Sequence, residues 1–479
     1  MARRKWSMMK QNERKRKKTI QLELFDGTAG KTLRIVEQPI GGGRQGTVYI
    51  KRGRGKARDE AVKIFHHCSP EAENAIKKLI SARFPKDVPI CRPKKWFHTK
   101  DGRFGYIMDL VGEDFVEYKD LIHRLTENGD QKDGLPSLAI ICRICYGLAE
   151  ILHCIHENGW VFPDLSENNF AFHPQKGLVV MFDSDNLRET SEAERGNVAI
   201  CGTYGSMAPE LVLGKSYPSR MSDNFALASV IFQMFMHHYP YDGKAMLEEI
   251  NDIDYYRQYH GVDPVFAFSS KRRSRILPNT GYYQEMWDCW ENVIPDQLKS
   301  MFRRAFETGA SHPQKRPEPK EWMYVFYMLA RKVIYCPECK YEMFAKEEQY
   351  ECPKCKKEFY IPKMWCGKRL LEVRIPIYKN REISPFEIEF SPDCHAEFPF
   401  HKAVLPIAKL VEDAGRPYLV NFDTRGTQWT CTYGKFKQTM AYGDGNLFAE
   451  NVCIQIPVKN GTWTVSLHED AVEEEELPF

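Results

Sequence analysis

Three side chains with oxygen atoms follow apolar segments in the middle of the chain, in an order that suits phosphoryl transfer. Asp164 and Asn169 stand five positions apart in WVFPDLSENNF, and Asp183 ends the apolar run in VVMFDSDNL. A carboxylate can accept the proton of a hydroxyl group, while a carboxamide and a second carboxylate supply the oxygen ligands that Mg2+ prefers. The pattern therefore predicts a centre that transfers a phosphoryl group to a hydroxyl with the help of two magnesium ions.

The glycine-rich segment GGGRQGTVYI is a candidate cover for nucleotide phosphates. It places Gly41, Gly43 and Gly46 in the pattern G-x-G-x-x-G, with Val48 two residues further on. Glycine has no Cβ, so its backbone N–H groups can approach phosphate oxygens closely. Taken alone, the pattern fits an ordinary turn between strands equally well. A dinucleotide-binding fold is disfavoured, because a strand and not a helix is expected to follow.

Lys63 is the candidate cation for these phosphates. It lies in AVKIF, on an alternating apolar strand that comes seventeen positions after Gly46. A single lysine in a strand usually faces solvent, so the argument depends on this spacing from the glycines. We expect its ammonium group to point inward, toward the nucleotide.

Together and in this order, the motifs resemble those of the protein kinases. CGTYGSMAPE ends in Ala208, Pro209 and Glu210, the signature that closes the activation segment, and Arg316 in QKRPEPKEW resembles the late arginine that pairs with this glutamate. The resemblance extends over about residues 30 to 333. Segments such as GYIMDLV, DLSENNF and DSDN are similar to a narrower bacterial group, the helix-hairpin-helix kinases. Members of that group are often encoded beside a von Willebrand A protein and a metal-dependent protein phosphatase.

The resemblance implies a role for each polar residue at the phosphate end of the site. Lys63 would contact the α- and β-phosphates of ATP, and Asp164 would receive the substrate hydroxyl. Asn169 and Asp183 would bind Mg2+. Thr203 would stand beside Asp164, as a threonine does in the serine/threonine kinases. The implied reaction is Mg-ATP-dependent phosphorylation of a protein hydroxyl.

The resemblance also implies where adenine binds. Met108 would be the gatekeeper, and Asp109 to Val111 would form the hinge that meets the base. Val48 would cover the nucleotide together with the three glycines. ATP and Mg2+ are thus the expected substrate and cofactor.

Several positions depart from the family pattern. Pro163 precedes the catalytic aspartate where many kinases have arginine, so we expect activity that does not require phosphorylation of residues 184 to 203. Ser166 replaces a lysine that reaches the γ-phosphate, which removes a positive charge and predicts slow turnover. Phe162, Ser184 and Asp185 replace His, Phe and Gly, so the packing behind the site is expected to be unconventional.

A helix after the lysine strand should supply a carboxylate that pairs with Lys63. Ser69 followed by Pro70 predicts a capped start, and the apolar spacing predicts a helix that stops near Pro85. Glu73 fits the inward face of this helix better than Glu71, although it lies closer to Lys63 along the chain than is usual. We expect Glu73 to be the partner.

A second motif follows the large helical region. It consists of two C-x2-C pairs separated by twelve residues, and these are Cys336, Cys339, Cys352 and Cys355. Four thiolates satisfy tetrahedral Zn2+ with no open position, so we expect a structural zinc ribbon and no zinc catalysis; free core cysteines or two local disulfides are the alternatives. Cys142 and Cys145 share the C-x2-C spacing but fall on the apolar face of a helix, which predicts core residues.

These residues must be held by a two-lobed α+β fold of the protein-kinase type. Strands are expected over residues 20 to 65, with a further strand pair around the turn at Asp101 and Gly102. A long buried helix is expected from 136 to 156, and helical patterns dominate from 223 to 334. Several strand-like segments follow residue 366, and they suggest a β-rich domain. His395 and His401 with Cys394 are a conceivable metal site there, although lone histidines in strand loops are more often surface or core residues.

The resulting domain plan has four parts. A basic arm over 1–19 precedes a kinase domain over 20–333, divided into a small lobe, 20–111, and a large lobe, 112–333. The zinc ribbon spans 334–362, and a β-rich accessory domain with an acidic tail spans 363–479.

Composition excludes several classes of protein. With 43% hydrophobic and 28% charged residues among 479, the chain is neither disordered throughout nor a small disulfide scaffold. A net charge of +3 does not favour a nucleic-acid partner, even with the basic arm. We find no uninterrupted apolar run of about 18 residues, which a membrane span needs, and no secretory signal pattern. A cytoplasmic location is expected.

A pseudokinase scaffold, which binds nucleotide or partners without transfer, is the alternative function. Ser166 and the altered residues after Asp183 support it. The presence of Lys63, Asp164 and Asn169 together with Asp183 opposes it.

Overall fold

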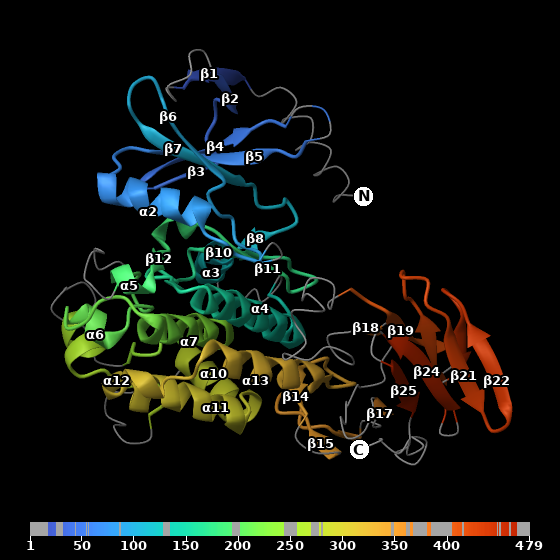
Figure 1. Ribbon diagram of the computed structural model, residues 1–479. Coiled ribbons are helices and arrows are strands. Elements are labelled where there is room, and N and C mark those ends of the chain that lie inside the picture. The colour runs from blue at the N-terminus through green and yellow to red at the C-terminus, as the bar shows by residue number, and fades with distance from the viewer. Residues whose placement is uncertain are drawn as a thin grey trace, which may run out of the picture.

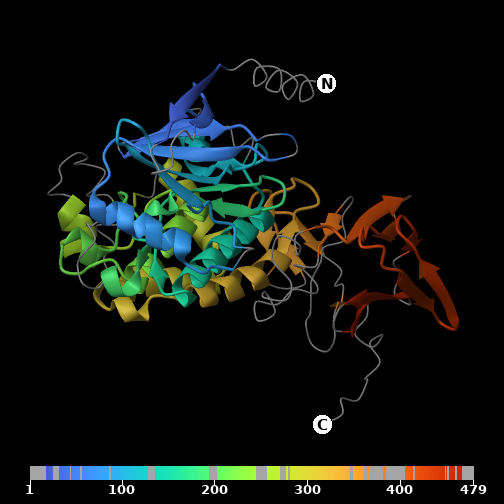
Figure 2. The ribbon, with the colours of Figure 1, turned by 45° about the horizontal axis from the view of Figure 1, so that its top comes forward.

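The computed structural model shows a strand-rich lobe above a helical lobe, with a second group of strands beside the helical lobe (Figures 1 and 2). The structure describes residues 18–24, 32–43, 45–53, 55, 57–85, 88–127, 135–193, 202–243, 256–269, 277–278, 281–345, 349–360, 365–366, 381–384, 405–413, 416–447, 449, 452–458 and 461–466. The expected basic arm before residue 18 and the acidic tail after residue 466 lie outside these ranges, as do His395, His401 and Cys394.

The small lobe is built on an antiparallel sheet in the order β3-β4-β5-β7-β6. Its strands are β3 (Gly41–Gly42), β4 (Gly46–Lys51), β5 (Glu60–Phe65), β6 (Lys95–His98) and β7 (Phe104–Asp109). A separate pair, β1 (Thr19–Glu23) and β2 (Thr32–Val36), precedes them. Gly102 takes a φ of 83° in the β6–β7 turn, a conformation that glycine adopts without strain, and this confirms the expected turn.

Helix α2 (Pro70–Ser81) packs against this sheet. The Ser69 hydroxyl accepts a hydrogen bond from the Ala72 N–H at 3.2 Å, and Pro70 occupies the first turn, where its missing N–H costs nothing. Ala75, Ile76 and Leu79 form the buried face of the helix. The capped start predicted from the sequence is confirmed.

The large lobe is centred on α4 (Leu138–Glu157), capped by Ser137. Cys142 and Cys145 are fully buried on this helix, which confirms that this C-x2-C pair is part of the core. By length and composition α4 could cross a membrane, but 67% of the apolar window is buried inside the protein, as in the core helix of a globular domain.

The remaining elements of the large lobe pack around α4 (Figure 1). The α-helices are α3 (Tyr118–Glu127), α5 (Thr190–Ala193), α6 (Pro209–Val212), α7 (Arg220–Met236), α10 (Tyr282–Asp288), α11 (Asp296–Arg303), α12 (Gly309–Ser311) and α13 (Pro319–Arg331). The strands are β8 (Val116–Glu117), β9 (Trp160–Val161), β10 (Phe170–Phe172), β11 (Val179–Met181) and β12 (Arg188–Glu189). Strands β11, β10 and β8 form one small sheet, and β12 pairs with β9. These short strands fix the loops between them at the junction of the lobes.

The cysteine-rich segment is joined directly to the large lobe. Strand β13 (Val333–Tyr335) follows α13 and pairs with β14 (Glu342–Phe344), while β15 (Gln349–Glu351) pairs with β16 (Glu358–Tyr360). The Glu342 carboxylate accepts a hydrogen bond from the Leu138 N–H at 2.6 Å, so it caps the first turn of α4. The segment is therefore packed onto the large lobe and is not a detached module.

The C-terminal strands form a two-sheet sandwich. One sheet has the order β17-β25-β24-β21-β22 and the other the order β18-β19-β20-β23. The strands are β17 (Trp365–Cys366), β18 (Arg381–Ile383), β19 (Ala408–Asp413), β20 (Arg416–Asn421), β21 (Trp429–Tyr433), β22 (Phe436–Met440), β23 (Gly445–Leu447), β24 (Val452–Val458) and β25 (Gly461–Ser466). Their inward side chains, including Trp429, Ile454 and Leu419, form a separate core. The β-rich character expected for this region is confirmed.

Candidate active site

The loop that carries Asp164 is anchored to the core of the large lobe by Asp223 of α7. It connects β9 with β10, and its Phe162 N–H donates to the Asp223 carboxylate of α7 at 2.8 Å. Asp223 is 1% exposed and also contacts His156 Nε2 at 2.9 Å. A buried carboxylate that satisfies a loop N–H and an imidazole makes the loop rigid, because leaving it unpaired would be costly. The position of Asp164 is thus fixed by the hydrogen bond between its loop and Asp223.

Asp164 is half-buried and hydrogen-bonded on two sides. The Thr203 hydroxyl donates to its Oδ1 at 3.0 Å, which is the contact expected for Thr203. The Asn169 amide donates to the main-chain carbonyl of Asp164. Burial raises the pKa of Asp164 above its usual value, and the hydrogen bonds from Thr203 and Asn169 oppose this only in part. A carboxylate with a raised pKa is a better proton acceptor.

Asp183 and Asn169 are brought together by their strands. Asp183 follows β11 and has a left-handed backbone with a φ of 53°, and its side chain is 40% exposed. The Phe182 N–H donates to the Asn169 carbonyl at 3.0 Å, which ties the two loops to each other. Since the Asn169 amide nitrogen donates to Asp164, its Oδ1 remains as an acceptor. One carboxylate and one amide oxygen from two loops that are bonded to each other are a donor set that fits Mg2+.

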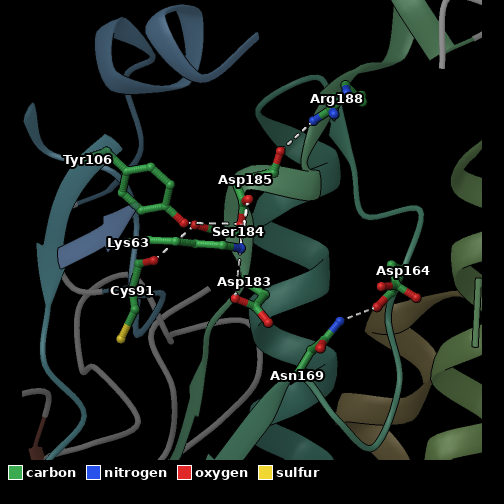
Figure 3. A network of polar contacts seen from close by, with 9 residues as sticks. All are labelled: Lys63, Cys91, Tyr106, Asp164, Asn169, Asp183, Ser184, Asp185 and Arg188. Atoms are coloured by element: carbon green, nitrogen blue, oxygen red, sulfur yellow. Dashed lines mark hydrogen bonds and ion pairs between the residues drawn. The ribbon is translucent and has the colours of Figure 1, made fainter. Parts of the chain in front are cut away.

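Lys63 reaches these residues from the other lobe (Figure 3). It is 5% exposed on β5, and its Nζ lies 3.3 Å from Asp183 Oδ1 and 2.9 Å from Asp185 Oδ2. Burial alone would lower the pKa of Lys63, but the attraction of Asp185 and then of Asp183 outweighs it, so the pKa lies above its usual value. The lysine is therefore charged and points inward, as its strand position predicted.

The expected pairing of Lys63 with Glu73 is wrong for this structure. The Glu73 carboxylate contacts Lys77 Nζ, one turn further along α2, and His98 Nε2 of β6 at 3.2 Å. Helix α2 starts only seven residues after Lys63, so Glu73 lies in its first turn and faces the β6 side of the lobe. Lys63 is instead paired with Asp185.

The glycine-rich segment forms the β3–β4 hairpin at the edge of the sheet. A Cβ at Gly46 would stand 2.6 Å from the Ile64 carbonyl, so glycine is required there by the approach of β4 to β5. A Cβ at Gly41 or Gly43 would meet no described atom within 4 Å. Strand packing therefore explains Gly46 but not the other two glycines, whose open side suits a phosphate.

An apolar group lies between the hairpin and the hinge. Val48, Met108 and Val111 belong to one hydrophobic cluster, which also includes Ala61 of β5 and Val180 of β11. The cluster thus takes residues from both lobes. It forms the kind of apolar surface that a flat aromatic base would need for binding. The Asp109 side chain lies outside it, since it is exposed and contacts Lys94.

The departures from the family pattern have structural explanations. The Ser184 hydroxyl donates to the Cys91 carbonyl at 2.9 Å in a fully buried position, so a polar contact replaces the aromatic packing expected there. Ser166 is also fully buried, and its hydroxyl accepts from the Asn168 N–H at 3.4 Å. Ser166 therefore contributes a hydrogen bond inside the loop.

The end of the activation segment is held by the expected ion pair. Arg316 is 2% exposed and donates to both carboxylate oxygens of Glu210, each at 2.7 Å. Such a two-point contact combines charge with fixed geometry. It fixes the segment 208–210 to the part of the lobe that precedes α13.

The four cysteines meet at one point. Their Sγ atoms all lie within 4.8 Å of one another, with Cys336 3.6 Å from Cys355 and Cys339 3.5 Å from Cys352. Four sulfurs around Zn2+ at about 2.3 Å would stand about 3.8 Å apart in a tetrahedron, so the arrangement fits zinc and is too wide for disulfides. Lys340 and Lys356 each follow a cysteine pair with a φ of 59°, which makes the two turns alike. The donor set fits a structural zinc site.

The sequence reasoning gave no site role to Asp223, Asp185 or Tyr106. Asp223 could have been found, because an acid within an otherwise apolar buried helix needs a partner. The sequence pattern marks Asp185 only as a replacement for glycine. The Tyr106 hydroxyl donates to Asp185 at 3.1 Å, and no spacing rule indicated that contact.

Comparison with known proteins agrees with this geometry. The family model described as protein kinase domain matches residues 34–325. The serine/threonine-protein kinase sgk-1 of Caenorhabditis elegans is 22% identical over 285 residues, which are 55% of this chain and 58% of that protein. Protein kinase C-like 1 of Candida albicans is 32% identical over 113 residues, 24% of this chain and 10% of that protein. Protein kinase C-like 2 of Schizosaccharomyces pombe is 33% identical over 101 residues, 21% of this chain and 10% of that protein. The chain thus spans at most 58% of the length of these relatives.

Proposed function

The chain belongs to the protein kinase family, and we propose that it is an active serine/threonine kinase that transfers the γ-phosphoryl group of Mg-ATP to a protein hydroxyl. The observation that carries the proposal is the arrangement around Asp164, which is fixed by Thr203 and Asn169 on a loop anchored by Asp223. In such enzymes catalysis consists mostly of positioning the reactants and stabilising charge. Both depend on side chains that are held in fixed positions, and neither needs an unusually reactive side chain.

In this proposal Asp164 accepts the proton of the attacking hydroxyl, helped by its raised pKa. Lys63 binds the α- and β-phosphates through its charged Nζ. Asn169 and Asp183 hold Mg2+, which when bound neutralises charge on the phosphate oxygens. Slow turnover remains the expectation, because Ser166 carries no positive charge that could reach the γ-phosphate.

The same geometry indicates where the adenine base and the phosphates of ATP bind. Adenine fits between Val48 and Met108, with the backbone of Asp109 to Val111 as the hinge that it meets. The open sides of Gly41 and Gly43 face the phosphates, whereas Gly46 lets the hairpin lie close to the sheet. We also propose that the four-cysteine cluster binds structural Zn2+.

The test is transfer of labelled phosphate from Mg-ATP to a generic basic protein and to the enzyme itself. Asp164→Asn should abolish transfer and leave ATP binding intact, while Asp183→Asn should abolish transfer and weaken binding of Mg-ATP. Asp296→Asn is the matched control, because Asp296 is fully exposed on α11 and should leave the rate unchanged. Label must appear on serine or threonine.

Failure has a clear form. If the wild-type protein binds Mg-ATP but transfers no phosphate, the enzyme proposal is refuted, and the nucleotide-binding scaffold becomes the function. If the label persists in Asp164→Asn, the role of Asp164 is refuted and the proton must go elsewhere.

We further propose that the chain is a cytoplasmic kinase of the bacterial helix-hairpin-helix group, with a von Willebrand A protein and a metal-dependent phosphatase as partners. The support is the sequence resemblance of GYIMDLV, DLSENNF and DSDN to that group. Co-purification of the kinase with these two neighbours tests the partnership, and phosphate that the phosphatase removes from the kinase product would support it. Neighbouring genes of unrelated kinds would refute it.

A further inference from the structure

The buried lysine of the site is paired with a carboxylate from an unusual place in the chain. In protein kinases the lysine of this strand must be paired with a glutamate from the helix that follows. We propose that Asp185, two residues after the metal-binding Asp183, is instead the positioning residue for Lys63. This inference rests on the proposed function and adds a residue to its machinery.

The first support is the contact itself (Figure 3). Lys63 Nζ lies 2.9 Å and 3.1 Å from the two carboxylate oxygens of Asp185, and both side chains are 6% exposed or less. The Tyr106 hydroxyl donates to Asp185 Oδ1 at 3.1 Å, and Tyr106 is directly opposite Lys63 in the β5–β7 register. The carboxylate therefore has a cation and a neutral donor, as a buried charge requires.

The second support is the backbone that presents Asp185. Asp183 takes the left-handed conformation, and a turn of 3-10 helix follows over Ser184–Asn186, with the Leu187 N–H donating to the Ser184 carbonyl at 3.0 Å. The Arg188 guanidinium donates to the Asp185 carbonyl at 2.6 Å. Together with the buried Ser184 contact, these bonds fix the turn with Asp185 pointing at Lys63.

The third support is what helix α2 presents. Its sequence, PEAENAIKKLIS, contains two acids, Glu71 and Glu73. Glu71 is exposed, and Glu73 is bound to Lys77 and His98. The buried face consists of Ala75, Ile76 and Leu79, which cannot pair with a cation. Helix α2 therefore supplies packing and no counter-charge.

A functional consequence follows from this placement. One short turn supplies both the metal-binding Asp183 and the lysine partner Asp185. Where a helix glutamate is the partner, displacement of that helix separates the pair and stops catalysis. Here the pair depends on the turn after β11, which itself contacts α2. The helix therefore supports the turn by packing, while the counter-charge for Lys63 comes from Asp185.

The experiment compares Asp185→Asn with Glu73→Gln in full-length protein. Asp185→Asn keeps the shape and removes the charge, and kcat/KM for ATP should fall about 30-fold or more, since it removes one partner of a buried charge pair. Glu73→Gln removes the rival helix carboxylate and should change kcat/KM by less than about threefold, because its contacts are with partly exposed groups. A large loss in Glu73→Gln with a small loss in Asp185→Asn would overturn the proposal.

A second readout separates positioning from general damage. Asp185→Glu returns a carboxylate to this position, so comparing it with Asp185→Asn separates the charge from general damage to the turn. In Asp185→Glu, kcat/KM for ATP should be at least about threefold higher than in Asp185→Asn, because a counter-charge for Lys63 is present again. Equal kcat/KM in the two folded variants would overturn the proposal. Tyr106→Phe removes only a hydroxyl and should slow transfer less than Asp185→Asn does; should Asp185→Asn fail to fold, an unaltered kcat/KM in Tyr106→Phe would count against the proposal.

The two levels of inference can fail separately. A wild-type protein without transfer would refute the proposed enzyme, yet the Kd for Mg-ATP in Asp185→Asn and in Glu73→Gln would still test the pairing of Lys63 with Asp185. Normal transfer by the wild-type protein together with an unchanged kcat/KM in Asp185→Asn would refute the pairing alone.

Discussion

Glu210→Gln should destabilise the domain far more than an equal change on its surface. Arg316 is buried and donates four hydrogen bonds, two to Glu210 at 2.7 Å and one each to the Gly309 and Met221 carbonyls at 2.9 Å. The glutamine keeps the shape, but it removes the counter-charge and turns an amide donor toward the guanidinium.

The magnitude follows from the burial of the pair. Removing one partner of a buried ion pair costs about 3–5 kcal/mol, and the two carbonyls that still accept from Arg316 place the cost near the lower figure. For roughly 300 residues that unfold together, the entropy of unfolding is about 0.6 kcal/mol/K, so about 3 kcal/mol lowers the melting temperature by about 5 °C. Against a total stability of about 5–15 kcal/mol this is a large loss.

The assay is thermal unfolding with a matched surface control. Glu321 contacts Arg304, but their side chains are 44% and 39% exposed. Glu321→Gln should cost about 1 kcal/mol or less, hence under about 2 °C. In a double-mutant cycle, Arg316→Met and Glu210→Gln should fall short of additivity by at least about 1 kcal/mol. Equal shifts in the two glutamine variants, or strict additivity in the cycle, would refute the reasoning.

Three further predictions concern zinc, pH and regulation. Cys352→Ser should reduce bound zinc from about one ion per chain to near none and lower the unfolding temperature, whereas Cys154→Ser should keep the metal; metal analysis with thermal unfolding checks this, and a wild-type protein without zinc contradicts it. The transfer rate should fall as pH is lowered through the pKa of Asp164, because the base must be ionised; this pKa lies above the ordinary 3.8, and a profile that stays flat down to that pH speaks against Asp164 as the base. Protein treated with a phosphatase should keep its rate within about twofold, since Pro163 leaves no arginine to bind a phosphorylated loop; activity that returns only on phosphorylation of that loop would show the opposite.

Much of the site could be predicted because it depends on local spacing. Asp164 and Asn169 lie five residues apart on one loop, and Asp183 comes two residues after β11, which pairs with the strand that follows that loop. Short chain separations and regular strands fix such positions almost by themselves. The contact of Thr203 with Asp164 needed the family resemblance, since thirty-nine residues separate them along the chain.

The partner of Lys63 could not be predicted in the same way, and the reason is conformational. The choice of Glu73 assumed that the helix after the strand presents a carboxylate inward, but its short connection leaves Glu73 in the first turn, beside His98. Asp185 reaches Lys63 only because Asp183 adopts a left-handed conformation and a 3-10 turn follows. A non-glycine residue with that backbone is uncommon, so sequence patterns give it little weight. A residue that departs from the family pattern is thus the one that completes the ion pair, because Glu73 of the helix contacts Lys77 and His98 instead.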